Sequence, residues 1–269
     1  MDLHLTGKRA LVTGASSGIG AGIARALAAE GAHVAVHGRD RDRTEAVVAA
    51  IRGAGGTVHA VTGDLRDDGQ AEGVFRRVED ALGGMDILVN NAGVYLPSTW
   101  DTAEARGWAE LYEANVVSAV RLARLAAPGM RERGWGRILN CGSGEAQQPL
   151  AQMPEYAATK AALANLTVSL AKHLAGSGVT VNLISPGIVA TEGLRTFFGR
   201  VAEERGWGDP ADWPAVERRV VAEWAPNTVG RLGTVEEVAS FFAYLASPHA
   251  GFINGSVLRI DGGFVGAVM

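Results

Sequence analysis

Short apolar runs alternate along the chain with longer segments in which apolar residues recur every three to four positions. The runs cover residues 9–13, 34–36, 58–61, 87–89, 137–140, 179–184 and 256–260. Helical spacing separates them, most clearly where Ile19, Ile23 and Leu27 follow the first run. Continuous apolar strands separated by helices predict a parallel sheet covered on both faces. The expected fold is α/β, a Rossmann-like, doubly wound sheet of seven parallel strands, with ligands bound beyond the carboxyl ends of the strands.

Size and composition predict a single domain that spans residues 1–269. Hydrophobic residues make up 47% of the chain and charged residues 20%, which suits one packed core. The formal net charge of −4 provides no broad positive field, so we expect no nucleic-acid partner. Cys141 is the only cysteine, which excludes an intrachain disulfide and a zinc site built from several cysteines. Without a leader-like start or a run of about 18 apolar residues, we expect a cytoplasmic protein with no membrane partner and no metal.

Residues 191–227 break the alternation of strands and helices. Pro210, Pro214 and Pro226 lie in this stretch and are expected to interrupt any regular structure. Five aromatic residues gather there as well, namely Phe197, Phe198, Trp207, Trp213 and Trp224. Long insertions in a compact domain commonly cover or line a binding site. We therefore expect this segment to form a lid or wall over the substrate.

A glycine-rich turn, Thr13-Gly14-Ala15-Ser16-Ser17-Gly18-Ile19-Gly20, joins the first predicted strand to the first predicted helix. Without side chains at the three glycines, a pyrophosphate could approach backbone amides at the positive end of the helix dipole. A tight turn that binds nothing would also use glycines here. The position directly after the first strand is what favours a dinucleotide site.

The end of the second predicted strand, Val36-His37-Gly38-Arg39, bears on the choice between the two nicotinamide cofactors. In this fold an acidic residue at that point binds the ribose 2′-hydroxyl. Gly38 removes the carboxylate that would repel a 2′-phosphate, and Arg39 offers a charge-assisted fork for it. NADP(H) is thus expected, with NAD(H) as the alternative. Arg39 could instead merely begin the charged run of residues 39–43.

Two further polar groups follow later strands. Asp64 closes the third strand and could accept a hydrogen bond from an adenine amino group, or could cap the helix that begins near Asp67. Asn90-Asn91-Ala92-Gly93 follows the fourth strand, where backbone must pass close to a bound ligand. An ordinary turn would have a similar sequence. Both positions lie at the edge of the sheet where ligands are expected.

Tyr156 and Lys160 lie four residues apart in the predicted helix 155–175, so their side chains share one face. A nearby ammonium group lowers the pKa of a phenol from its ordinary value of ~10. Such a phenol can give a proton to a carbonyl oxygen as hydride arrives, or take one from an alcohol as hydride leaves. This spacing also arises by chance on many exposed helices.

Ser143 and Asn115 are further candidates for the chemistry. Ser143 follows the fifth strand and could steady the reacting oxygen, or could make only a local backbone turn. Asn115 lies in the predicted helix 103–127, where a buried amide must pair with backbone or hold a water.

Together these residues resemble the short-chain dehydrogenase/reductase family, and the likeness extends from Gly7 to Phe264. The glycine turn matches the T-G-x-x-x-G-x-G motif of that family. The segment after the fourth strand matches the N-N-A-G motif, and Tyr156 with Lys160 matches the Y-x-x-x-K motif. Ser143 and Asn115 complete the tetrad of catalytic residues. Four motifs in the correct order make coincidence a poor explanation.

The resemblance implies a role for each member of the tetrad. Tyr156 would be the acid/base, and Ser143 would orient the substrate oxygen. Lys160 would bind the nicotinamide ribose, lower the pKa of Tyr156 and join a proton relay through a water on Asn115. Hydride would pass from the pro-S face of the nicotinamide.

Further positions are implied by two later motifs. Pro186-Gly187 with Thr191 is similar to the P-G-x-x-x-T motif of the family, which contacts the nicotinamide carboxamide. Asp261-Gly262-Gly263 is similar to the closing motif of the family, which lies near the subunit contact. Members are commonly tetramers, so a homotetramer is expected. The implied cofactor residues are Gly14, Ser16, Ser17, Gly18, Ile19, Gly20, Arg39, Asp64, Leu65, Asn91, Ala92, Gly93, Tyr156, Lys160, Pro186, Gly187, Ile188 and Thr191. The expected substrate residues are Ser143, Glu145, Gln148, Tyr156, Gly187, Phe197 and Trp224.

The expected function is reduction of a small carbonyl compound, or oxidation of the matching secondary alcohol. A second reading is reduction of 3-oxoacyl groups on a carrier protein. Such carriers are acidic and would need a basic patch beside the cleft, for which the candidates are Arg121, Arg124, Arg131 and Arg133. A third reading, a non-catalytic NADP(H) sensor, would have no need for the four residues of the tetrad.

Overall fold

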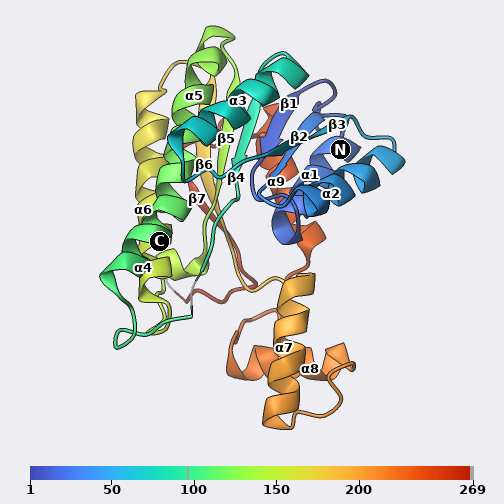
Figure 1. Ribbon diagram of the computed structural model, residues 1–269, viewed down its shortest axis with the longest axis vertical. Coiled ribbons are helices and arrows are strands. Elements are labelled where there is room, and N and C mark those ends of the chain that lie inside the picture. Colours follow the sequence, from blue (N-terminus) through green and yellow to red (C-terminus); the bar gives the residue numbers. More distant parts are fainter. Residues whose placement is uncertain (96, 267–269) are drawn as a thin grey trace.

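A single parallel sheet with helices on both faces organises the chain in the computed structural model, which describes residues 1–95 and 97–266 (Figure 1). The strands are β1 (Arg9–Val12), β2 (His33–Gly38), β3 (Val58–Thr62), β4 (Ile87–Asn90), β5 (Gly136–Cys141), β6 (Val179–Pro186) and β7 (Val257–Ile260). They pair in parallel in the order β3-β2-β1-β4-β5-β6-β7. The predicted seven-stranded, Rossmann-like sheet is confirmed.

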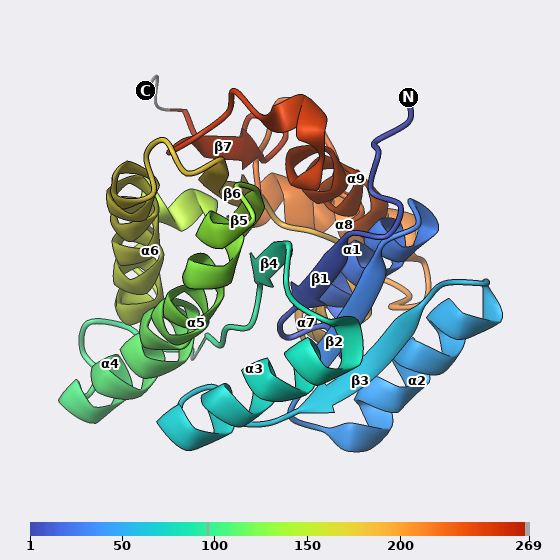
Figure 2. The same cartoon turned by 90° about the horizontal axis from the view of Figure 1, so that it is seen from above.

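The helices divide between the two faces, as the view from above shows (Figure 2). They are α1 (Gly18–Ala29), α2 (Arg41–Gly53), α3 (Asp68–Leu82), α4 (Ala105–Tyr112), α5 (Ser118–Glu132), α6 (Pro154–His173), α7 (Glu192–Arg205), α8 (Trp213–Glu223) and α9 (Val235–Ala246), with the short η1 (Glu113–Val117), η2 (Gly144–Ala146) and η3 (Pro248–Ala250). Helices α1, α2 and α9 share one apolar core, and α3, α5 and α6 share the other. Along β1, Ala10 and Val12 enter the first core while Leu11 enters the second.

The strand order reverses at β1. From β1 the chain moves outward to β2 and β3, then returns so that β4 pairs with the other side of β1. The loops that follow β1 and β4 therefore part to opposite sides and leave a crevice at the carboxyl edge of the sheet. The glycine turn and the N-N-A-G segment occupy these two loops.

Residues 191–227 form two helices, α7 and α8, where the sequence predicted interrupted structure. That expectation was wrong because the prolines lie at or outside the helix ends. Pro214 occupies the first turn of α8, where a missing backbone N–H costs nothing. Phe198, Val216 and Val220 form a small apolar core between the helices. The pair extends beyond the carboxyl edge of the sheet, away from the main cores (Figure 1).

The predicted helix 103–127 is also divided. The segment Glu113–Val117 is a π-helix between α4 and α5, and Asn115 lies at its centre. A π-helical turn widens the backbone by one residue, and such turns are frequent at functional sites. No helix within residues 1–95 and 97–266 combines the length and apolar character needed to cross a membrane. The same described ranges contain no group of three or more His, Cys, Asp or Glu side chains placed to hold a metal ion.

Candidate active site

The glycine turn after β1 is packed too tightly for side chains. Gly14 has a φ of +62°, and a Cβ there would lie 2.7 Å from the Cα of Ala92. Gly18 has a φ of +55° and faces Thr191, whose Cγ2 would lie 3.4 Å from an added Cβ. Positive φ and close backbone approach both favour glycine. The turn thus holds bare backbone at the start of α1, beside the loop that follows β6.

The N-N-A-G segment after β4 is tied to this turn by hydrogen bonds. The Asn91 side-chain amide donates to the carbonyl oxygens of Thr13 and Gly14, at 2.9 and 3.1 Å. The Thr13 hydroxyl accepts from the backbone N–H groups of Asn91 and Ala92, at 3.0 and 2.9 Å. These bonds join the two loops that flank the crevice, so neither can shift without the other.

His37 of β2 contacts the glycine turn through a hydrogen bond and was not predicted as a site residue. Its Nδ1 accepts from the backbone N–H of Gly14 at 3.3 Å, and its Nε2 lies 3.0 Å from the carbonyl oxygen of Gly63. Burial lowers the pKa of His37 to about 4, so the ring is neutral and Nε2 carries the proton. A lone histidine in an apolar strand gives no sequence signal of this role.

A cavity of about 250 Å³ opens where these loops meet the end of β2. Its walls include Ser16, Ser17, Gly38, Leu65, Asp64 and Gly93, together with the side chains of Arg39, Arg43 and Arg66. A Cβ on Gly38 would lie 2.9 Å from the Cβ of Ser16, so this glycine keeps the wall open. Within the described residues, the guanidinium groups of Arg39 and Arg43 make no hydrogen bond or ion pair. They are two exposed positive charges at one end of the cavity.

Asp64 is held by a neighbour and caps no helix. Its carboxylate accepts hydrogen bonds from the side chain of Arg66, which lowers the pKa of Asp64 to about 2. Helix α3 is capped by Asp67, whose side chain accepts from the backbone N–H of Gln70. The reading of Asp64 as a helix cap was therefore wrong. Asp64 still lines the cavity, as expected for the adenine side of a dinucleotide.

Thr191 and Gly187 bring the loop after β6 into the same region. Thr191 caps α7 through its hydroxyl, which accepts from the backbone N–H of Leu194 at 3.3 Å. Gly187 follows Pro186 at the end of β6, and a Cβ there would lie 2.9 Å from the Cα of Asp261. The Ile188 carbonyl accepts a hydrogen bond from the backbone N–H of Gly233. The two predicted motifs near the carboxyl edge thus meet through backbone.

Asn115 links three elements at the base of the crevice. Its Oδ1 accepts from the Val94 N–H at 2.8 Å, and its Nδ2 donates to the Val94 carbonyl and the Thr159 hydroxyl, at 2.9 and 3.1 Å. The side chain is buried and fully engaged with backbone and α6. Pairing with backbone, which the sequence raised as one alternative for Asn115, is observed.

Lys160 and Tyr156 lie together on α6. The Lys160 ammonium is buried, donates to the Cys141 carbonyl at 2.8 Å and lies 5.5 Å from the centre of the Tyr156 ring. The ring of Tyr95 packs edge-on against Tyr156, with centroids 6.4 Å apart. An ammonium group whose direct partner is a neutral carbonyl keeps donors available for a further acceptor.

The pKa of Tyr156 differs in direction from the sequence-based expectation. Burial raises it, and the field of Cys141 adds to this, while a hydrogen bond with Ser143 lowers it. Burial likewise lowers the pKa of Lys160. Both groups lose hydration in the crevice, and desolvation outweighs the expected effect of the ammonium. Tyr156 is thus a neutral phenol at neutral pH, which is the proton-donating form.

Ser143 lies directly before η2, in the loop that follows β5. Its Oγ accepts from the backbone N–H of Glu145 at 3.2 Å. The preceding Gly142 packs against β6, because a Cβ there would lie 3.0 Å from the Ser185 hydroxyl. The amide oxygen of Gln148, one of the expected substrate residues, accepts from the Gly266 N–H at 3.0 Å. Its amide oxygen therefore holds the C-terminal segment in place.

Phe197 and Trp224 form part of an aromatic cluster on α7 and after α8. Their ring centroids are 6.4 Å apart, and both pack edge-on against the buried Phe198. Phe197 and Trp224 keep 40% and 39% of their surface exposed, so the cluster presents an apolar face to solvent.

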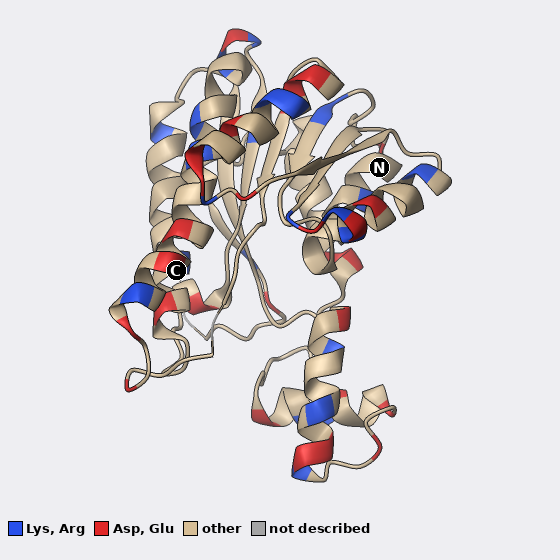
Figure 3. Cartoon of the chain, in the orientation of Figure 1, with Lys and Arg blue, Asp and Glu red and all other residues tan. Residues whose placement is uncertain are grey.

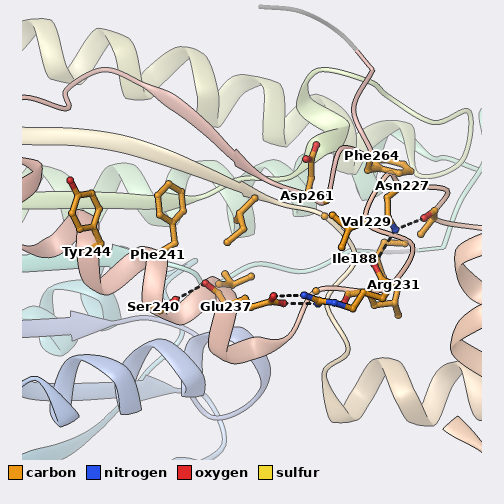
Figure 4. A pocket seen from close by; sticks show the side chains of 17 residues that line it. Ile188, Asn227, Val229, Arg231, Glu237, Ser240, Phe241, Tyr244, Asp261 and Phe264 are labelled. Atoms are coloured by element: carbon orange, nitrogen blue, oxygen red, sulfur yellow. Dashed lines mark hydrogen bonds and ion pairs between the residues drawn. The ribbon is translucent and has the colours of Figure 1, made fainter. Parts of the chain in front are cut away.

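A second, larger cavity of about 520 Å³ lies along α9 and the end of β7 (Figure 4). Figure 4 shows Tyr244, Phe241 and Glu237 of α9 facing it, and Glu237 pairs with Arg231 at its rim. Gly187 and Ile188 are the predicted cofactor residues in its lining, and the tetrad contributes nothing to it. Most of the predicted cofactor residues that line a cavity line the smaller one, at the ends of β1, β2 and β4.

The comparisons with known proteins agree with this geometry. The short chain dehydrogenase family model matches residues 8–199. The chain is 36% identical over 265 residues to an uncharacterized oxidoreductase, YvrD, of Bacillus subtilis, covering 98% of this chain and 99% of that protein. It is 35% identical to the 3-oxoacyl-[acyl-carrier-protein] reductase FabG of Vibrio cholerae, covering 97% and 98%.

Among solved structures, the L-sorbose reductase of Gluconobacter frateurii, complexed with NADPH and L-sorbose, superposes with a TM-score of 0.93. It shares 36% identity, and the match covers 100% of both chains. Sequence, fold and site motifs agree over nearly the whole length. The chain belongs to the short-chain dehydrogenase family.

Proposed function

We propose that this chain is an NADP(H)-dependent oxidoreductase that moves a hydride between nicotinamide and a ketone or secondary alcohol, with Tyr156 as acid/base. The observation that carries the proposal is the placement of Tyr156. Its phenol is acted on by the Ser143 hydroxyl and its ring lies beside the buried Lys160, at the same edge as the glycine turn. This arrangement supports proton transfer at an oxygen held between Tyr156 and Ser143.

NADPH, when bound, would supply the hydride, which forms a C–H bond at the carbonyl carbon as the carbon–oxygen π bond breaks. Tyr156 would give its proton to the carbonyl oxygen, so that the product is a secondary alcohol. Ser143 would hold that oxygen by its hydroxyl. Lys160 would donate to the ribose and favour the phenolate left on Tyr156. Asn115 keeps the π-helix and α6 in register, so that Lys160 stays beside the ring.

The proposed preference for NADP(H) rests on charge at the end of β2. Arg39 and Arg43 line the cavity without ion pairs in the described residues, and Gly38 adds no carboxylate. A 2′-phosphate would give both guanidinium groups a partner. The L-sorbose reductase that matches this chain was solved with NADPH, which agrees with this choice.

Reduction of acyl groups on a carrier protein is the less favoured alternative. Arg121 pairs with Asp68 and Glu113, and Arg133 pairs with Asp86 and donates to the Met85 carbonyl. Two of the four arginines proposed as a docking patch are thus engaged within the chain. Acidic and basic residues are also interspersed along the outer helices (Figure 3). The hypothesis of a non-catalytic sensor is not favoured, because it does not explain why Tyr156, Ser143 and Lys160 lie together.

Helices α7 and α8 would act as a substrate lid, with Phe197 and Trp224 as its apolar face.

A homotetramer is proposed from the exposed edge strand of the sheet. Strand β7 ends the sheet, its Ile260 lines the α9 cavity, and Phe252 is fully exposed. Light scattering would measure the molar mass of the assembly.

The buried, unpaired Cys141 agrees with a reducing compartment such as the cytoplasm.

The direct test is steady-state oxidation of NADPH and NADH against a panel of ketones and 3-oxoacyl thioesters. Wild-type protein should prefer NADPH and free ketones. Tyr156→Phe should lower kcat/KM by about 100- to 10,000-fold, because the proton donor is lost. Its affinity for NADPH should stay unchanged. A variant that keeps most of its rate would show that Tyr156 is not the acid/base.

A further inference from the structure

The loop after Ser143 carries polar side chains that the catalytic tetrad does not explain. Glu145 lies in the single turn η2, and Gln147 follows it. The Glu145 N–H donates to the Ser143 hydroxyl at 3.2 Å, which places this residue next to the group that would hold the substrate oxygen. The field of Glu145 also acts on the Tyr156 phenol. Glu145 is therefore within the reaction crevice.

Atoms of both side chains are buried without partners. Within the described residues, Glu145 Oε2 and both amide atoms of Gln147 lack any hydrogen bond. A buried polar group without a partner destabilises the folded chain. Gln148 in the same loop has found a partner in Gly266. The loop could therefore satisfy its side chains internally, yet leaves these two unsatisfied.

The protonation of Glu145 broadens what it can bind. Burial raises the pKa of Glu145 to about 7, so near neutral pH a large share of these side chains is protonated. A protonated carboxyl can donate one hydrogen bond and accept others, and the Gln147 amide can also do both. A substrate hydroxyl has the same double capacity. An alkyl chain can satisfy neither residue.

We propose that Glu145 and Gln147 bind hydroxyl groups beside the reacting carbonyl, so that the substrate is a polyhydroxylated ketone, or the matching polyol in the oxidative direction. The inference rests on the proposed function and specifies its substrate class. A long acyl chain would leave at least three buried polar atoms unsatisfied, whereas vicinal hydroxyls would pair with them.

The test compares racemic 1,3,4-trihydroxybutan-2-one with racemic 4-methylhexan-3-one, in which each hydroxyl is replaced by a methyl group of similar size. Wild-type kcat/KM with NADPH should favour the hydroxylated ketone by about 100-fold or more, because the analogue leaves buried groups unpaired. Glu145→Leu should cut that preference by about tenfold or more, by slowing the hydroxylated ketone alone. Gln147→Leu should also reduce it.

Glu145→Gln is the conservative variant and should retain most of the preference, because an amide still donates and accepts at that point. Gln152→Leu, an exposed change in the same loop, is the matched control and should leave both rates unchanged. A wild-type enzyme with no preference, or equal losses on both ketones in Glu145→Leu, would overturn the inference. Absence of NADPH oxidation with either ketone would instead contradict the proposed function on which it rests.

Discussion

Charged side chains lie both at the amino edge of the β-sheet, where the strands begin, and at its carboxyl edge, where the strands end. The two edges differ in how far those side chains are paired within the chain. At the amino edge, Asp86 accepts from Arg9 at 2.8 and 2.6 Å and pairs with Arg133 at 3.3 Å. The buried Arg137 donates to backbone carbonyls there, including that of Gly136 at 2.9 Å, and stacks on Trp135. The charges of these four side chains are satisfied within the chain.

At the carboxyl edge, several polar groups are left without partners, although Asp64 pairs with Arg66. Arg39 and Arg43 have no partner among the described residues, and Glu145 and Gln147 keep buried atoms unpaired. Unsatisfied groups reduce stability, and so they are expected where a ligand completes them. Both edges carry charge, so charge alone does not identify the binding site. What distinguishes the carboxyl edge, here called the functional edge, is that some of its polar groups lack partners within the chain.

The largest expected effect on the functional edge comes from Lys160→Met. Removing the ammonium beside Tyr156 should lower kcat/KM by about 100-fold or more, because the phenolate loses its stabilising charge. Lys172→Met, on the exposed face of the same helix, is the control and should not change the rate. Steady-state kinetics and circular dichroism would separate catalysis from folding. A Lys160→Met enzyme with wild-type kcat/KM would break the assignment.

Arg39→Ala should have the next largest effect. Loss of a charge-assisted hydrogen bond to the 2′-phosphate should raise KM for NADPH by about 10- to 100-fold while KM for NADH changes little. Arg41→Ala, whose side chain does not line the cavity, is the control. Equal effects on the two cofactors would remove the reason for expecting NADP(H).

Arg9→Ala should affect stability and not catalysis. The Arg9 side chain and backbone hold the pKa of Asp86 below its ordinary value, although burial alone would raise it. A lowered folded-state pKa contributes stability above the unfolded pKa of ~3.9, which is lost as pH falls through the folded value. The variant should lose about 1 to 3 kcal/mol at neutral pH and progressively less below about pH 4.

Urea unfolding at several pH values would measure this loss, with kcat/KM as the second readout. A large fall in activity with unchanged stability would contradict a purely structural role for the amino edge.

Much of this contrast could be predicted from the sequence. The apolar runs predicted all seven strands because the strands of a parallel sheet covered on both faces are rich in apolar residues. The tetrad was named through its family motifs, and the structure brings Tyr156, Ser143 and Lys160 together. Helices α7 and α8 were missed because their prolines suggest breaks, although they lie at or outside the helix ends.

Other features depend on tertiary surroundings that no local pattern encodes. His37 has the sequence context of a core residue, and only the fold places its Nδ1 beside Gly14. The direction of the Tyr156 pKa depends on burial in the crevice, which a four-residue spacing cannot reveal. Partners such as Gly266 for Gln148 come from segments far apart in sequence.

Amide hydrogen exchange with and without NADPH tests the central distinction most directly. The account predicts slower exchange on adding NADPH in peptides covering Thr13 to Gly20 and Asn91 to Val94. Peptides covering Thr6 to Arg9 and Gly83 to Asp86, at the amino edge, should exchange at the same rate in both samples. Protection confined to the amino edge, or none at the glycine turn, would contradict the assignment of the functional edge.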